Sequence, residues 1–121
     1  MVKKIVTENS TGIIDPERIY IYQVPEQLDV VKSLPIVKIS HVTSNAMTHS
    51  SNKLNYTKER LQIQYFYDAD FKLNIESKIL EIDRVLEEHG IYYSTGYDSY
   101  DPDFDGVLLI SRQYNYRNKI N

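Results

Sequence analysis

The chain has 121 residues, a formal net charge of −3 and no cysteine. The missing cysteines exclude disulfides, thiolate nucleophiles and cysteine-based zinc sites, and the acidic balance argues against tight duplex binding, which draws its affinity from basic residues. The length fits one domain over residues 1–121, with an ordinary globular composition of 41% hydrophobic and 26% charged residues. No stretch approaches the roughly 20 apolar residues of a membrane helix, so we expect no membrane contact.

The N-terminal quarter contains one predicted strand. Residues 1–7 fit either a helix or a strand, and they lack the apolar run of a signal peptide. Residues 18–24 alternate in a strand-like way, which places Ile19 and Ile21 on one face. Pro25 is expected to end this strand, because proline cannot donate to a ladder.

A hairpin with a long tip is predicted next. Residues 28–33 form a short connection of about one helical turn, and residues 35–43 form the second strand. The third strand spans residues 56–67, where hydrophobic and polar residues alternate as in a half-buried antiparallel strand. Between the two, a segment rich in serine and asparagine predicts a long polar hairpin arm at about 44–56, and long loops of this kind are usually functional or mobile.

The clearest predicted element is an amphipathic helix over about 70–89. Asp70 is a plausible N-cap, and Gly90 suits the left-handed position after the last turn. The apolar residues recur at helical spacing and predict packing against a sheet: Phe71, Ile75, Ile79, Ile82, Val85 and Leu86.

Two further strands, at residues 91–97 and 107–116, complete the expected fold. A turn-rich loop at 98–106 separates them, and the tail from 117 to 121 is expected to fray. The order β-β-(arm)-β-α-β-β predicts an α+β domain, in which a small mixed or antiparallel sheet of four to five strands carries one main helix on one face.

The most site-like motif is an acidic turn at residues 101–106. Asp101, Asp103, Asp105 and Gly106 match the first half of an EF-hand loop, which keeps a small calcium-binding module open as an alternative. However, the twelfth position is Arg112, where calcium requires a bidentate glutamate, and the flanks are strands. We therefore expect a solvated turn and no metal site.

No catalytic set emerges from the sequence, so we expect a binding protein without a cofactor, not an enzyme. The histidines, His41, His49 and His89, have no zinc-ligand spacing, and the four glycines form no phosphate loop. His41 is expected to be partly buried on an apolar strand face, and His89 to suit the end of the helix dipole. Eleven tyrosines without any tryptophan favour half-exposed strands and protein interfaces.

Several stretches resemble the tail-terminator (tail-completion) proteins of long-tailed bacteriophages. They are IYIYQVPE at 19–26, LPIVKISHV at 34–42, SSNK at 50–53, RLQIQYFY at 60–67 and EHGIY at 88–92. The resemblance covers about 100 residues, from 18 to 116. It rests on the order of the secondary-structure elements and on the general character of these stretches, and it includes no catalytic signature. Many members open with a full helix, for which only residues 1–7 are available here.

The resemblance implies a virion protein at the head–tail interface, assembled in the host cytoplasm. Such proteins form a ring, usually a hexamer, that caps the head-proximal end of the tail tube and stops its growth. The expected partners are further copies of the chain, the tail tube protein and the head–tail connector, while phage DNA only passes through the lumen. The mildly acidic charge agrees with this role, because it repels phosphates.

Three alternatives remain open. Another head–tail connector or head-completion protein would use a different face of a similar fold. A calcium- or nucleotide-binding module would use the loop at 101–106. A single-stranded nucleic-acid binder would stack bases on tyrosines, although the sequence shows no basic groove for it.

Overall fold

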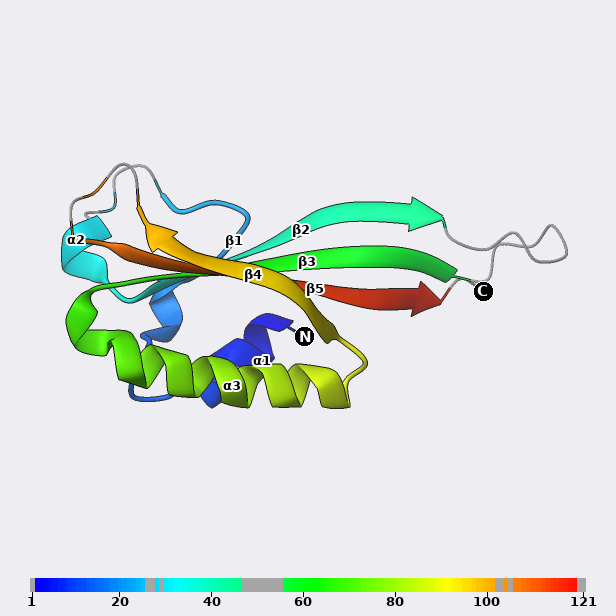
Figure 1. The fold of residues 1–121 in the computed structure, drawn as a ribbon, viewed down its shortest axis with the longest axis horizontal. Coiled ribbons are helices and arrows are strands. Elements are labelled where there is room, and N and C mark those ends of the chain that lie inside the picture. The colour runs from blue at the N-terminus through cyan, green and yellow to red at the C-terminus, as the bar shows by residue number, and fades with distance from the viewer. Residues whose placement is uncertain are drawn as a thin grey trace, which may run out of the picture.

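A computed structural model describes residues 2–25, 28, 30–46, 56–101, 104 and 106–119 of the chain (Figure 1). The elements are α1 (Val2–Asn9), β1 (Ile19–Ile21), α2 (Val30–Ser33), β2 (Ile36–Ala46), β3 (Tyr56–Tyr67), α3 (Lys72–Glu88), β4 (Tyr92–Tyr100) and β5 (Leu108–Lys119), with 3-10 turns at Pro16–Arg18 and Ala69–Phe71. The strands form one sheet in the order β1-β2-β3-β5-β4. β1 is parallel to β2, and the other pairs are antiparallel. The predicted α+β fold class is confirmed.

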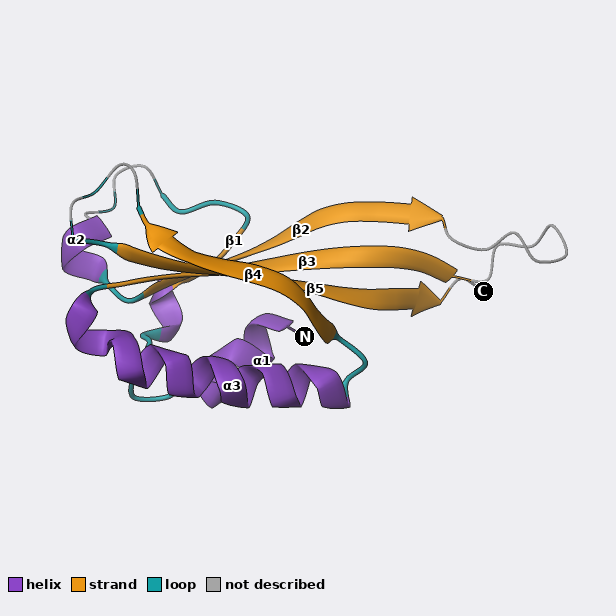
Figure 2. Cartoon of the chain, in the orientation of Figure 1, coloured by secondary structure: helices purple, strands orange, loops and turns teal. Residues whose placement is uncertain are grey.

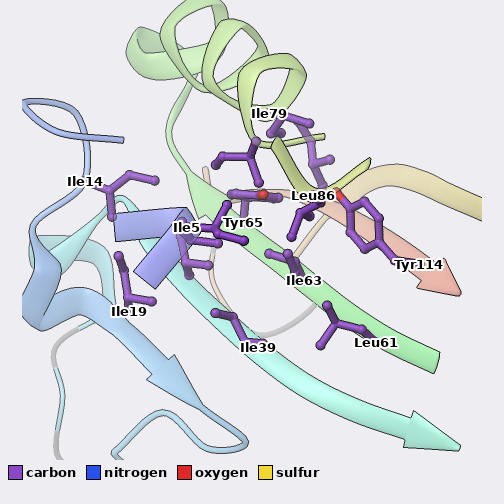
Figure 3. Close-up of a cluster of buried hydrophobic side chains, with 14 of the residues drawn as sticks. Ile5, Ile14, Ile19, Ile39, Leu61, Ile63, Tyr65, Ile79, Leu86 and Tyr114 are labelled. Atoms are coloured by element: carbon purple, nitrogen blue, oxygen red, sulfur yellow. The ribbon is translucent and has the colours of Figure 1, made fainter. Parts of the chain in front are cut away.

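The core lies between one face of this sheet and the two longer helices (Figure 2). α3 contributes Ile75, Ile79, Ile82 and Leu86, all buried as the helical spacing predicts. α1 adds Ile5 and Val6, which settles the open question about residues 1–7 in favour of a helix. Figure 3 shows Ile5, Ile79 and Leu86 from these helices beside Ile63 and Tyr65 of β3 and Tyr114 of β5. No helix in the described ranges is both long and apolar enough to cross a membrane.

The start of α3 differs from the prediction, whereas its end agrees. Asp70 is not the N-cap: Asp68 accepts a hydrogen bond from the backbone N–H of Asp70 and begins a 3-10 turn that leads into α3. The Asp68 side chain satisfies a backbone N–H donor at the start of the 3-10 turn, so the cap lies two residues before the predicted position. Gly90 takes the left-handed conformation, with φ of 79°, as predicted for the residue after the helix.

β1 is shorter than the predicted strand over residues 18–24. Tyr22 adopts a φ of 67°, and its N–H still donates to Ile39 O at 2.8 Å before the chain turns away. The strand therefore ends before Pro25. Ile19 is buried but Ile21 is 46% exposed, although the alternation places both on one face, because Ile21 lies at the end of an edge strand.

β2 and β5 run beyond the predicted strand ends, whereas β3 spans the predicted residues 56–67. Ser44–Ala46 belong to β2, where the sequence predicted the polar arm, and β5 continues to Lys119 through residues expected to fray. Each extension gains a ladder partner, since Ala46 pairs with Thr57 and Tyr56 pairs with Lys119. The three strands extend past α3 as a projection (Figure 1), here called the arm: residues 40–46, 56–60 and 115–119. The predicted hairpin tip at 47–55 lies outside the described residues.

Replacing Ile82 with aspartate should unfold the core. Ile82 is fully buried, so an unpaired charge there should cost several kcal/mol and lower the Tm by more than about 10 °C. Leu73→Asp on the same helix is the matched control, because Leu73 is 79% exposed and should leave the Tm nearly unchanged. Equal thermal melts for the two variants would contradict the packing described here.

Candidate assembly surfaces

The outer strand β4 is the most exposed part of the sheet. All nine of its residues are exposed, including Tyr92, Tyr93, Tyr97 and Tyr100. One edge of β4 pairs with β5, and β4 stands last in the strand order of the described sheet. Its other edge therefore presents backbone donors and acceptors outward, and such an edge can pair with a strand from another chain.

The register distributes the tyrosines of β4 over both faces of the sheet. Tyr93 lies opposite the buried Tyr114, so it belongs to the face that carries the helices. A register shift follows between Tyr93 and Thr95, after which Tyr97 pairs with Ser111 and belongs to the opposite face. The strand can therefore contact a partner with tyrosine rings on either side, and tyrosine is a residue enriched at interfaces.

Gly96 allows β4 to approach β5 closely. A Cβ atom at position 96 would lie 2.4 Å from the carbonyl oxygen of Ser111, closer than real contacts permit. It would also lie 3.2 Å from the hydroxyl of Tyr93. Glycine in a strand interior commonly marks such an approach, and here it sets the position of the exposed edge.

A polar cluster fixes β4 and β5 to the helix. The Asp83 carboxylate on α3 accepts hydrogen bonds from the Arg112 guanidinium and the Tyr114 hydroxyl. Arg112 also lies 3.7 Å from the centroid of the Tyr93 ring, in cation–π geometry, and Tyr93 meets Tyr114 edge to face. Burial, followed by the hydrogen bond to Asp83, raises the pKa of Tyr114. This cluster was not predicted from the sequence. The available signal is the position of Asp83, which directly follows Ile82 of the apolar stripe and stands apart from the outward-facing charges of the helix.

The arm carries a basic patch on the sheet face opposite the helices. Lys58 and Arg117 lie directly across from each other in the register, and Arg60 follows two residues after Lys58 on the same face. The opposite face of the arm bears Glu59, whose carboxylate is nearly buried and pairs with the His41 imidazole. His41 is thus partly exposed and hydrogen-bonded to Glu59, in a position that the sequence described only as partly buried.

Charge is unevenly distributed along the chain. Residues 40–62 and 114–119 contain five basic and one acidic residue, a net charge of +4. The remaining residues contain nine basic and 16 acidic residues, a net charge of −7. The modest overall charge of −3 therefore hides basic segments, which include the arm, and an acidic remainder of the chain.

One acidic hollow lies between α3 and β4. It encloses about 270 Å³, and its walls include Glu76, Leu80, Asp98 and Arg112. Leu80 is 69% exposed. Both carboxylates influence Tyr67. Burial, followed by the negative charges of Asp98 and Glu76, raises the pKa of the Tyr67 hydroxyl.

The predicted acidic turn is only partly described. The N–H of Asp101 donates to Val107 O at 2.9 Å, and Gly106 has a φ of 78°, as a tight turn requires. Asp103 and Asp105 lie outside the described residues, and so does His49, so the calcium alternative stays untested.

His89 caps the end of α3, where its Nδ1 lies 2.9 Å from Val85 O. A hollow of about 310 Å³ beside the acidic turn is lined by Tyr22, Gln23, Val24, Val30, Ile36, Lys38, Phe66, Asp101 and Phe104.

Gly96→Ala should displace the outer strand without unfolding the core. The added methyl group forces β4 away from Ser111, so backbone amides of β4 should exchange with solvent faster while those of β3 stay protected. Hydrogen–deuterium exchange measures both. Ser99→Ala, on the same exposed strand, is the control and should exchange like the wild type.

Asp83→Ala should destabilise the fold through its unpaired partners. Arg112 and Tyr114 lose their acceptor in a site where the ion-paired side chains are only about one-fifth exposed, at 19% for Arg112 and 18% for Asp83. We expect a loss of about 2 kcal/mol in the free energy of unfolding, measured by urea denaturation. Glu87→Ala, at an exposed position of the same helix, should change it by less than about 0.5 kcal/mol.

Comparisons with known proteins identify a related fold. The sequence matches no known protein family, and no curated protein is similar to it in sequence. Among solved structures, a chain from the "Virion of native gene transfer agent (GTA) particle" superposes with a TM-score of 0.60. The match covers 98% of this chain and 94% of that chain at 10% sequence identity. At this identity the likeness shows that the two chains share a fold.

Proposed function

We propose that the chain is a structural protein of a phage-like virion, and more specifically a tail terminator. In this role, copies of the chain form a hexameric ring on the head-proximal end of the tail tube, where they stop tube growth and present the joining surface for the head connector. The protein acts by binding and catalyses no reaction. It enters the virion after assembly in the host cytoplasm, and DNA passes through the ring.

One observation carries this proposal: the fold shared with a virion chain along almost the full length of both chains. Shared fold alone does not determine function, so the surfaces must also suit assembly. The outer strand β4 does, because its edge is open and its tyrosines are exposed. The arm supplies a second projecting surface beyond the body (Figure 1).

Assembly state is the direct test. The purified chain should form a ring of several copies, detected by size-exclusion chromatography with light scattering and by negative-stain electron microscopy. Added to growing tail tubes, it should cap one end and limit their length. A stable monomer that leaves tube length unchanged would contradict the proposal, and capping of the head portal in place of the tube would favour a head-completion protein.

Substitution on β4 should weaken the ring. Tyr97→Lys places a positive charge on the open edge strand. An interface charge without an opposite charge on the partner disfavours association. We expect the apparent dissociation constant of the ring to rise at least tenfold, while the Tm of the subunit stays unchanged. Tyr22→Lys, at another exposed tyrosine, is the control and should assemble normally.

A further inference from the structure

Two surfaces of opposite charge lie far apart on the same chain. The basic patch of the arm comprises Lys58, Arg60 and Arg117. The acidic hollow lies between β4 and the first half of α3, and α3 begins at the end of the molecule away from the arm (Figure 1). Because the surfaces are separated, they cannot neutralise each other within one copy.

The basic patch gathers positive charge on one face of the arm. Lys58 and Arg60 lie two residues apart on the same face of β3, and Arg117 lies directly across from Lys58. Arg60 is exposed and Lys58 is half-buried. An acidic surface seated against this face meets Lys58 and Arg60 together, and such charge complementarity fixes the register between partners.

The hollow has the chemistry to receive it. Glu76 and Asp98 supply carboxylates, while the positive charge of Arg112 is already engaged by Asp83 and by the Tyr93 ring. Leu80 offers an exposed apolar wall beside the carboxylates. Lysine and arginine suit such a site, because their aliphatic stems pack on apolar surface while their charged ends reach acidic partners.

We propose that the basic face of the arm in one copy, Lys58 and Arg60 above all, docks into the α3–β4 hollow of a neighbouring copy at Glu76 and Asp98. This inference rests on the proposed ring and names the contact that builds it. The two patches differ, so the contact is head-to-tail, and a repeated head-to-tail contact closes into a ring when the rotation permits. A second copy fits the arm better than nucleic acid does, because the chain outside residues 40–62 and 114–119 carries a net charge of −7 and repels phosphates.

Charge-swapped variants test the contact. Lys58→Glu with Arg60→Glu reverses the arm, and Glu76→Lys with Asp98→Lys reverses the hollow. Each double variant alone should fail to form rings at physiological salt, because like charges then meet at every contact. Mixed in equal amounts, they should assemble into rings with alternating subunits, since each reversed arm meets a complementary hollow.

The control separates a specific contact from the net charge. Lys3→Glu with Lys4→Glu, on exposed positions of α1, changes the charge as much as the arm variant does and should leave rings intact. Circular dichroism checks that every variant is folded. If a double variant is unfolded, the single changes Arg60→Glu and Asp98→Lys give the same test with a smaller expected effect.

The outcomes distinguish this contact from the ring itself. Rings formed by the arm variant alone, or no association in the mixture, would overturn the proposed contact. If the wild type forms no ring but the two variants bind each other in sedimentation experiments, the contact stands and the proposed ring fails. Intact rings together with lost binding of a labelled DNA duplex at low salt would overturn the contact and assign the arm to nucleic acid.

Discussion

The burial of one sheet face beneath α3 is the constraint on which the rest of the structure depends. Ile75, Ile79, Ile82 and Leu86 cover β3 and β5, and α1 closes the same face with Ile5 and Val6. Since both helices lie on this side, the other face, the outer strand β4 and the arm are left for contacts with other molecules. A one-sided core thus determines which surfaces remain open.

Much of this arrangement could be predicted because the helix and β3 keep strict periodicity. The apolar spacing of α3 identified its buried residues, and the alternation of Leu61, Ile63, Tyr65 and Tyr67 identified the inner face of β3. The ends of two other strands were predicted poorly, because ladder pairing extends β2 and β5 through polar residues that carry no hydrophobic pattern, whereas β3 spans the predicted residues. The Asp83 cluster and the paired His41 and Glu59 depend on residues distant in sequence, which no local spacing reveals.

The surfaces required the three-dimensional register. The sequence shows 11 tyrosines but does not separate the buried Tyr65 and Tyr114 from the exposed ones on β4. Likewise, the net charge of −3 suggested an evenly acidic subunit, whereas the register gathers Lys58, Arg60 and Arg117 on one face of the arm. Average charge therefore says little about a protein whose opposite ends differ in sign.

The composition of β4 has a consequence for its open edge. An open edge strand is ordinarily a template for fibrous aggregation. β4 contains no valine, isoleucine or leucine, and it carries an irregularity near Tyr93, a glycine at 96 and a charge at Asp98. Each of these features opposes indefinite stacking of identical strands. The same strand can therefore stay uncovered without stacking on further copies of itself.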